Sequence, residues 1–422
     1  MIALALAIPF LFLHIKYQPG VRVPLGSTHL GIEASDVAVL VVAIVALRNG
    51  LREGFGRLRP ALSLWVATAL LVVWIFARTQ SLTHFVTAAK FAEYALLALS
   101  LPLILRSFRQ WEVVAGAVIL WSVAATFVAL LQIFGWGILD AWPAGRRQPS
   151  FLGHSDFAAL SAFALGIGLA AVLNARRSVG WVGVASGVVG LMLAGATAGL
   201  IGTVAGAAGL LVVIARRRRL QLRDFAVTGG CVALVAAGVL TLRAGDFEQF
   251  LRFLHLKGRE TQTSNIETYS HHTLLAYIGY RIWRDHPVAG AGWQASNQPG
   301  TVDPVLPAAR RKFPNLPALA FPTREHEWGI QNAYVQAAAD LGVVGLVLLL
   351  APFVISLVLA FRANAPPCAV ATFAVLAAAG IWLGQGIVAG IPLDALTWLG
   401  FGLAATAAAQ RSSGAPRGKW EP

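Results

Sequence analysis

Two polar stretches of this chain carry side chains that could bind a ligand or move a proton. The first, YRIWRDHPVAGAGW at residues 280–293, gathers two arginines, an aspartate and a histidine in an otherwise apolar sequence. The second, REHEWGIQN at residues 324–332, brings together a cation, two carboxylates, an imidazole and two amides. Charged groups at the entrance to a membrane segment need partners or a ligand, so both stretches are candidates for the functional site.

The second stretch has the residue types of a proton-transfer site. A histidine titrates near ambient pH, and flanking carboxylates orient its ring and support the protonated form. His326 lies between Glu325 and Glu327, so we predict that His326 acts as a base. A solvated loop histidine is the alternative interpretation. The same alternative applies to His271 and His272, which are further candidates.

The elements that must position these residues are membrane helices. Hydrophobic residues make up 57% of the chain and charged residues 12%, and the mean hydropathy is +0.69. These values are typical of polytopic membrane proteins. We therefore expect an all-α fold of about twelve membrane helices, because only a helix satisfies its own backbone within a single lipid-exposed segment. The apolar runs predict spans near 1–15, 34–47, 61–77, 85–105, 112–135, 157–174, 179–195, 197–215, 224–242, 333–361, 367–387 and 391–410.

The ends of the chain and its cysteines add little to this layout. Met1–His14 lacks a basic start and a small-residue cleavage site, so we expect it to stay as the first span. Cys231 and Cys368 lie in different predicted spans, which argues against a disulfide framework.

Lysines and arginines in the short loops predict the orientation. Most of them fall on one side, including the run of arginines at 216–219, and cytoplasmic loops carry this excess. Both termini are therefore expected in the cytoplasm, with the large loop periplasmic. The predicted organisation is nine spans in 1–242, a periplasmic loop domain in 243–332, three spans in 333–410 and a disordered cytoplasmic tail in 411–422.

The outer loop contains an amphipathic helix. In NIETYSHHTLLAYIGYRIWRDHP, residues 265–287, apolar side chains recur at helical spacing, and Tyr277, Arg281 and Arg284 fall on other faces. Proline cannot continue a helix, so the segment should end at Asp285–Pro287. Gly290 and Gly292 then permit a tight turn against the bilayer face. The apolar face consists of Leu274, Leu275, Ile278 and Ile282.

Three motifs resemble the O-antigen ligase and O-antigen polymerase superfamily. YRIWRDHPVAGAGW is similar to the family's amphipathic segment with its His-Pro and Gly-x-Gly turn. QNAYVQAAADLGVVGL, residues 331–346, resembles its His-Asn-x-Tyr-Leu-type helix start followed by acidic-Leu-Gly-x-x-Gly. SFLGHSDFAALSAFALGIGLA, residues 150–170, resembles its Gly-x-x-x-Asn-x-Phe-type entry into a membrane helix. The resemblance covers roughly 150–350 and is compatible with the twelve-span layout.

The resemblance implies a glycosyltransferase. Such enzymes move a glycan from an undecaprenyl-diphosphate carrier to an acceptor hydroxyl outside the inner membrane, on lipid A core in the ligases and on another lipid-linked glycan in the polymerases. They are metal-independent, hold the diphosphate with arginines and often use a histidine as base. The implied partners are this donor, a glycolipid or glycan acceptor and membrane lipids, without a cofactor. No metal site is expected, since no His/Cys/Asp/Glu spacing in the loop matches one. No nucleic-acid partner is expected either, because the arginines lie at the ends of apolar runs rather than in a basic domain.

Under the resemblance, four arginines are candidates to bind the diphosphate. Arginine binds two phosphate oxygens at once through its planar fork. Arg281 and Arg324 flank the family-like motifs and are the first choices, followed by Arg284 and Arg259. Arginines at a membrane surface also meet lipid headgroups, which is the alternative for each of them.

The chain departs from the family pattern at three positions. The family histidine before the asparagine is Gln331, the arginine that often opens the amphipathic segment is His272, and a Ser-Arg pair is Ala196-Thr197. The resemblance is thus to a divergent branch that supplies the same chemistry from neighbouring residues, or to one that has lost the activity. Gln331 is retained as a catalytic candidate. Further pocket candidates are Asn332, Tyr334, Arg146, Arg147 and the pair Lys90 and Glu93, whose spacing permits an ion pair within one helix.

Three other functions remain open at this point. A polymerase of the same superfamily has the same signature. A transporter or flippase of lipid-linked sugars is disfavoured by the lack of a convincing repeat relating the two halves. A catalytically silent homologue that only binds the lipid-linked glycan would account for the three departures.

Overall fold

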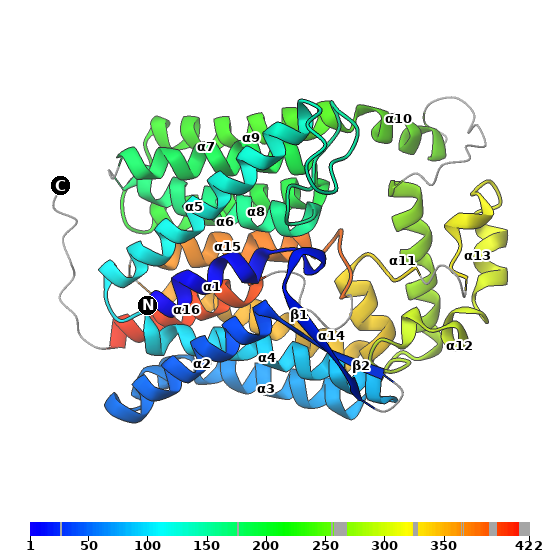
Figure 1. Cartoon of the computed structure of the whole chain (residues 1–422), viewed down its shortest axis with the longest axis horizontal. Helices are drawn as coiled ribbons and strands as arrows, with labels where there is room; N and C mark the ends of the chain where they lie inside the picture. The colour runs from blue at the N-terminus through cyan, green and yellow to red at the C-terminus, as the bar shows by residue number, and fades with distance from the viewer. Residues whose placement is uncertain are drawn as a thin grey trace.

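The computed structural model of the chain describes residues 1–25, 28–174, 177–254, 256, 268–323, 328–363, 365, 367–387 and 395–412. Long helices run side by side, and a cap of short elements covers one end of this bundle (Figure 1). The N-terminus and the end of α16 lie at the opposite end (Figure 1).

Most bundle helices begin and end close to the predicted apolar runs. The bundle helices are α1 (Ile2–Phe12), α2 (Ala34–Glu53), α3 (Leu62–Ala77), α4 (Leu82–Ile104), α5 (Phe108–Ile133), α6 (His154–Leu173), α7 (Arg177–Ala194), α8 (Thr197–Ala215), α9 (Leu222–Leu242), α14 (Ala333–Arg362), α15 (Pro367–Ile381) and α16 (Ala395–Ser412). However, α2 ends six residues later than predicted and α15 six residues earlier.

Among the described residues, eight helices are long and apolar enough to cross a membrane, and three shorter apolar helices accompany them. An all-α polytopic membrane protein is therefore confirmed, whereas the number of twelve spans stays a prediction. The predicted tail began at 411, but α16 continues to Ser412.

Small residues bring the central helices close together. On α8, Gly202 lies so near Gly380 of α15 that a Cβ added to Gly380 would stand 2.3 Å from the Gly202 Cα. A Cβ added to Gly187 of α7 would stand 2.6 Å from the backbone nitrogen of Leu165 on α6. In a bilayer, where helix association depends on van der Waals packing, such close approach stabilises the bundle.

A β-hairpin that the sequence analysis did not predict connects α1 to α2. The 3₁₀ helix η1 (Ile15–Tyr17) leads into β1 (Gly20–Leu25), which pairs antiparallel with β2 (Thr28–Glu33), with Gly20 opposite Glu33. Glu33 and Asp36 form a capping box that begins α2. A second 3₁₀ helix, η2 (Gly56–Ala61), precedes α3.

Helix α14 is broken, although its apolar run predicted a continuous span. At Gly342 the backbone has φ 70° and ψ −171°, a conformation accessible to glycine. The turn after α11 pairs with the freed backbone: Ala291 N donates to Ala339 O (2.8 Å), Gly292 N to Asp340 O (2.9 Å) and Val343 N to Pro287 O (2.9 Å). The Gly-x-Gly turn therefore packs against α14, which corrects the prediction that it faces the bilayer.

A buried carboxylate fixes the same junction. The side chain of Asp340 is fully buried, and its Oδ1 accepts a hydrogen bond from Ser296 N at 2.8 Å. Gln336 Nε2 donates to its Oδ2 at 3.3 Å. These bonds hold the segment that follows the turn against α14.

The cap consists of α10 (Ala244–Phe253), α11 (Thr268–Asp285), η3 (Ala295–Asn297), α12 (Pro299–Val302), α13 (Leu306–Lys312) and η4 (Ala318–Ala320). Helix α11 lies across the ends of the long helices (Figure 1). Its predicted apolar face is confirmed, because Leu274, Leu275, Ile278 and Ile282 are all buried. They form a separate core with Val302, Val305, Ala309, Phe321 and Ile330.

Candidate functional site

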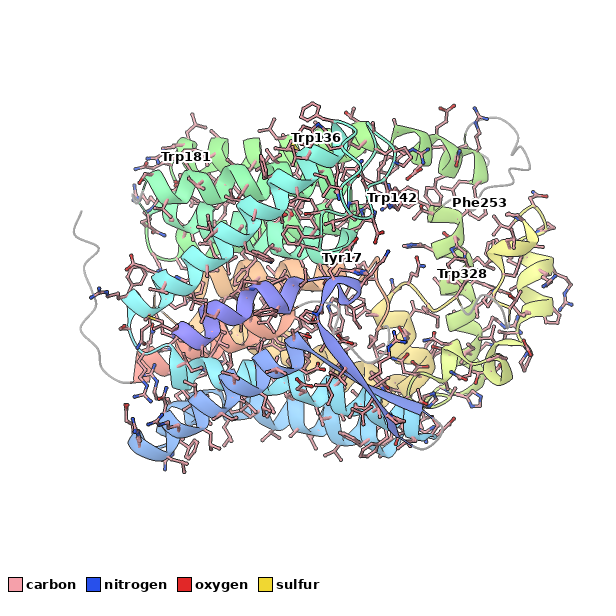
Figure 2. The ribbon with its side chains drawn as sticks, in the orientation of Figure 1. Tyr17, Trp136, Trp142, Trp181, Phe253 and Trp328 are labelled. Carbon is pink, nitrogen blue, oxygen red and sulfur yellow. The ribbon has the colours of Figure 1, made fainter. Side chains whose placement is uncertain are left out.

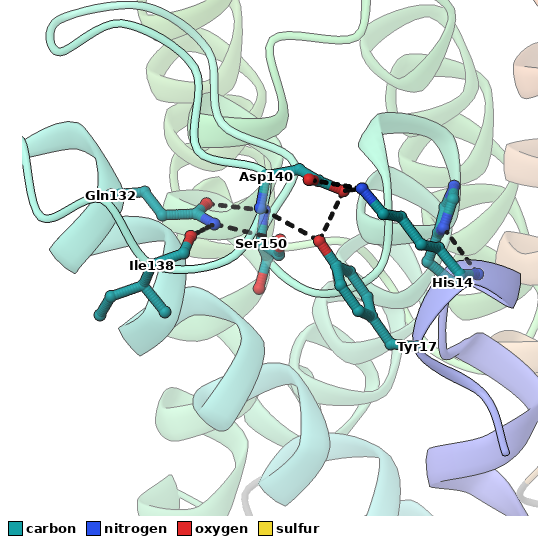
Figure 3. Close-up of polar contacts among 7 residues, drawn as sticks. His14, Tyr17, Gln132, Ile138, Asp140 and Ser150 are labelled. Atoms are coloured by element: carbon teal, nitrogen blue, oxygen red, sulfur yellow. Dashed lines mark hydrogen bonds and ion pairs between the residues drawn. The ribbon is translucent and has the colours of Figure 1, made fainter.

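The loop between α5 and α6 is held in place at the cap end of the bundle. Lys16 Nζ forms an ion pair with Asp140 at 2.7 Å, and the Tyr17 hydroxyl donates to the same carboxylate at 2.7 Å (Figure 3). Gln132 Nε2 donates to the carbonyls of Ile138 and Ser150, at 3.0 and 3.1 Å (Figure 3). These contacts anchor both sides of the loop that carries Arg147.

Arg147 is directed toward the turn between α7 and α8. Its neighbour Gln148 donates from its backbone nitrogen to Leu193 O at 2.8 Å. A Cβ added to Gly195 would lie 2.7 Å from the Arg147 Cβ. The guanidinium carbon stands 4.6 Å from the centre of the Trp142 ring, which in turn contacts the His154 ring edge-to-face at 4.5 Å.

Arg243 reaches the same turn from the end of α9. Its side chain is 4% exposed and forms an ion pair with Asp246 at 2.8 Å. Nη1 lies 3.4 Å from the Thr197 hydroxyl, and the guanidinium carbon lies 4.6 Å from the centre of the Tyr269 ring. The Thr197 and Tyr269 hydroxyls share a hydrogen bond of 2.5 Å, which ties the start of α8 to α11.

His272 follows Tyr269 by one helical turn on α11 and completes the group. The pKa of His272 is lowered to about 4, mainly by burial and then by the charges of His271, Arg243 and Arg147. Its imidazole is therefore neutral at neutral pH. We call Arg147, Thr197, Arg243, Tyr269 and His272 the arginine cluster.

The arginine cluster has an excess of positive charge. Burial lowers the pKa of Arg147 to about 10, and the charge of Arg243 is the next cause. Within the described residues, Asp246 forms an ion pair with Arg243 of the cluster, and its carboxylate is 38% exposed. Because Arg243 lowers the pKa of Arg147, a bound anion beside the two guanidinium groups would be favoured, since it would supply negative charge.

Two predicted diphosphate ligands lie elsewhere on α11. Arg281 is nine residues from His272, about half a turn around the helix, and its Nη1 donates to the Tyr277 hydroxyl at 3.3 Å. Arg284 is exposed and lies 3.8 Å from Asp285. The structure does not bring either of them to the arginine cluster. His271 is buried within the cap, where its ring contacts Trp328 at 4.9 Å.

The predicted residues at the start of α14 have structural contacts. Asn332 caps the helix, since its Oδ1 accepts from the backbone nitrogens of Tyr334 and Val335 at 3.1 and 3.0 Å. The Tyr334 hydroxyl donates to Ala379 O at 2.7 Å and ties α14 to α15. Gln331, one residue before the cap, is partly buried.

Lys90 does not pair as its spacing suggested. Its Nζ lies 2.8 Å from Asp36 Oδ2 on α2, and both side chains are 14% exposed. Glu93 is therefore not the ion-pair partner, because the capping carboxylate of α2 approaches Lys90 from the neighbouring helix. Helices α2 and α4 lie on the opposite side of the bundle from α7 and α9, so this pair is remote from the arginine cluster (Figure 1).

Some predicted site residues fall outside the described residues. They are Arg259, Arg324, Glu325, His326 and Glu327. Their roles stay predictions. Arg146 is exposed beside Arg147.

Arg243, Tyr269 and the contact of Thr197 with both were not predicted from the sequence. Arg243 immediately follows an apolar run, where an arginine ordinarily marks the membrane boundary. The Arg–Asp spacing of 243 and 246 was the available signal, since an ion pair three residues apart holds the guanidinium in place.

The family model described as O-antigen ligase matches residues 182–350, whereas no curated protein matches the chain. The matched segment includes most of α7, all of α8 and α9, the cap and the break in α14, and therefore all of the arginine cluster except Arg147. Together with the polytopic helical fold and the three motifs, this match supports membership of the O-antigen ligase superfamily.

Proposed function

We propose that this protein transfers a glycan from undecaprenyl diphosphate to an acceptor hydroxyl on the outer side of the inner membrane, as an O-antigen ligase. The observation that carries this proposal is the arginine cluster, where Arg147 and Arg243 concentrate positive charge at the cap end of the bundle. A diphosphate matches this charge, and arginine forks fit its oxygens.

The distribution of basic residues supports the outer position of the cap. At the end of the bundle away from the cap (Figure 1), the helix ends and the segments that connect them carry Arg48, Arg52, Arg57, Arg59, Arg106, Arg109 and the run Arg216–Arg219. Cytoplasmic loops carry such an excess. The arginine cluster would then face the periplasm, where the acceptor is located.

In the proposed reaction, the acceptor oxygen attacks the anomeric carbon of the donor glycan. The bond from that carbon to the phosphate oxygen breaks, and the undecaprenyl diphosphate leaves with the bonding electrons. Arg147 and Arg243 stabilise the negative charge of this leaving group. No redox change and no further reactant are needed.

His272 would accept the proton of the acceptor hydroxyl. Its ring is neutral, as a base must be, and the bound diphosphate would raise its pKa from about 4 toward ambient pH. His326, flanked by Glu325 and Glu327, remains the alternative base from the sequence. Separate His272→Asn and His326→Asn variants distinguish the two, because only loss of the base lowers kcat while donor binding is retained.

The test is transfer by the purified protein in liposomes. The donor is lipid-linked glycan extracted from cells of the source organism that lack this protein, and the acceptor is their unmodified lipopolysaccharide. We expect glycan on the lipid A core with wild type, a strong loss with Arg243→Met, and no loss with the matched exposed variant Arg284→Met.

Other products would overturn the assignment. Lengthened lipid-linked glycan would identify a polymerase. Movement of the donor across the bilayer without transfer would identify a flippase, and donor binding without any product would identify a silent homologue.

A further inference from the structure

A row of aromatic rings leads away from the arginine cluster. Tyr269 stacks on Phe247 with 5.1 Å between the ring centroids, and its ring centroid lies 5.3 Å from that of Phe250. Phe250 stacks on Phe253 at 6.1 Å, and Phe253 stacks on Phe313 at 6.0 Å. We call these five residues the aromatic row. It is continuous with the cluster because Arg243 stands over Tyr269.

The aromatic row lies outside the bundle. Helix α10 continues beyond the end of α9, away from the long helices (Figure 1). Phe253 lies at the far end of α10, between α10 and α13, whereas Trp142 lies near the bundle (Figure 2). A glycan that extends away from the membrane would follow this direction, whereas a lipid tail would return along the long helices.

The aromatic row is accessible. No residue of α10 is buried, and all of α10 is within the described residues. Each of the five rings is partly exposed. The rings therefore contact one another without being enclosed in a core, which leaves apolar surface available to a ligand.

Polar side chains lie on the same helix as three of the rings. Asp246 pairs with Arg243, which stands over Tyr269, and Glu248 pairs with Arg252 at 2.9 Å along α10. Beyond Phe313, the Tyr277 ring follows at 5.5 Å. Sugars present an apolar C–H face and a hydroxyl edge, so aromatic rings bordered by a few polar groups suit them.

We propose that the aromatic row binds the glycan of the lipid-linked donor. The sugar next to the diphosphate lies over Tyr269, and the following sugars extend along Phe250, Phe253 and Phe313. The donor is thus selected for its glycan as well as for its carrier. This inference rests on the proposed function for the identity of the donor, but the aromatic row can be tested separately.

The experiment compares two probes bound to the full-length protein. One probe is undecaprenyl diphosphate without a glycan, and the other is the lipid-linked glycan extracted from source cells that lack this protein. We expect Phe253→Ala to weaken binding of the second probe roughly tenfold, because part of one apolar contact is lost, while the affinity for the first changes less than twofold. Phe225→Ala, an exposed phenylalanine on α9, should change neither.

Conservative variants control for folding. Phe253→Trp keeps an aromatic face and should retain tight binding of the glycan probe, whereas Phe253→Leu keeps an apolar side chain without a ring and should not. Equal weakening of both probes by Phe253→Ala would overturn the proposal in favour of a contact with the lipid. Unchanged binding of both probes would also overturn it.

The binding data also distinguish an error in the proposed function from an error in the glycan site. If wild type does not bind undecaprenyl diphosphate, the donor assignment is wrong. The aromatic row is then tested with the same glycan released from its lipid by mild acid. Weaker binding of this free glycan by Phe253→Ala supports the glycan site, and equal binding by wild type and variant refutes it.

Discussion

Replacing Arg243 by methionine tests the centre of the proposed site. The substitution keeps an unbranched side chain over the Tyr269 ring, which lies 4.6 Å from the guanidinium carbon. It removes the charge and the contact with the Thr197 hydroxyl at 3.4 Å. The substitution should therefore weaken anion binding more than it lowers the free energy of unfolding.

The structure sets the size of both effects. Hydrogen bonds to a charged group contribute roughly 1.5–3 kcal/mol, so the Kd for undecaprenyl diphosphate should rise about 10- to 150-fold. In this variant the carboxylate of Asp246 loses its ion-pair partner, but it is 38% exposed and can be solvated by water. The free energy of unfolding should therefore fall by only about 1 kcal/mol, rather than the ~3–5 kcal/mol of a fully buried broken pair.

The substitution Asp246→Asn should change the affinity for undecaprenyl diphosphate in the opposite direction. Asp246 competes with the ligand for Arg243, since the two side chains are 2.8 Å apart. Removing its charge should tighten binding of undecaprenyl diphosphate roughly threefold, which corresponds to a partly exposed ion pair. Titration of the detergent-solubilised protein with undecaprenyl diphosphate measures both variants, and thermal unfolding measures their stability. The reasoning is refuted if Arg243→Met binds within twofold of wild type, or if Asp246→Asn weakens binding as much as Arg243→Met does.

Three further predictions concern neighbouring features. The pKa of His272 is lowered from 6.5 to about 4 in the folded state. The neutral ring therefore contributes to the free energy of unfolding above pH 6.5, and this contribution is lost as the pH falls toward 4. In thermal unfolding measured at each pH, His272→Asn should lose less stability than wild type over this range. Gly290→Ala should lower the free energy of unfolding by roughly 2–4 kcal/mol, because φ is +72° and the new Cβ would lie 2.3 Å from the Asp340 backbone; Gly300→Ala, with open space around it, is the control. Lys90→Met should cost about 3 kcal/mol by leaving Asp36 unpaired at 14% exposure, and adding Asp36→Asn should recover most of this loss; if the double variant is no more stable than Lys90→Met, the pair is not the cause.

The sequence predicted those elements whose pattern is local. Helix α11 was predicted because its apolar residues recur at helical spacing and a His-Pro pair ends it, and the same residues are buried in the structure. The break at Gly342 could not be predicted in this way. Glycine is frequent in membrane helices, and the break depends on Ala291 and Gly292 donating to the freed carbonyls from a turn some fifty residues away.

The candidate site was predicted only in part, because some of its contacts join residues that are distant in the sequence. Arg147 was a candidate, and His272 was recognised as a departure from the family pattern. Arg243 lies at the end of a span, where sequence alone does not distinguish a membrane-boundary arginine from a ligand-binding one. Its distance of 3.4 Å from Thr197 results from the packing of α9 against the turn between α7 and α8. Lys90 illustrates the same limit, because its partner Asp36 comes from another helix.

The positions of Arg147 and Arg243 bear on the three departures from the family pattern. Two of them replace an arginine, at His272 and in the Ala196-Thr197 pair. In the structure, Arg243 approaches Thr197 from α9, and both Arg243 and Arg147 lie near enough to His272 to lower its pKa. Two guanidinium groups held together in a partly buried place destabilise the folded chain unless an anion is bound. Arg147 and Arg243 thus bring two guanidinium groups close to the positions of the missing arginines, which supports relocation of the anion site rather than its loss.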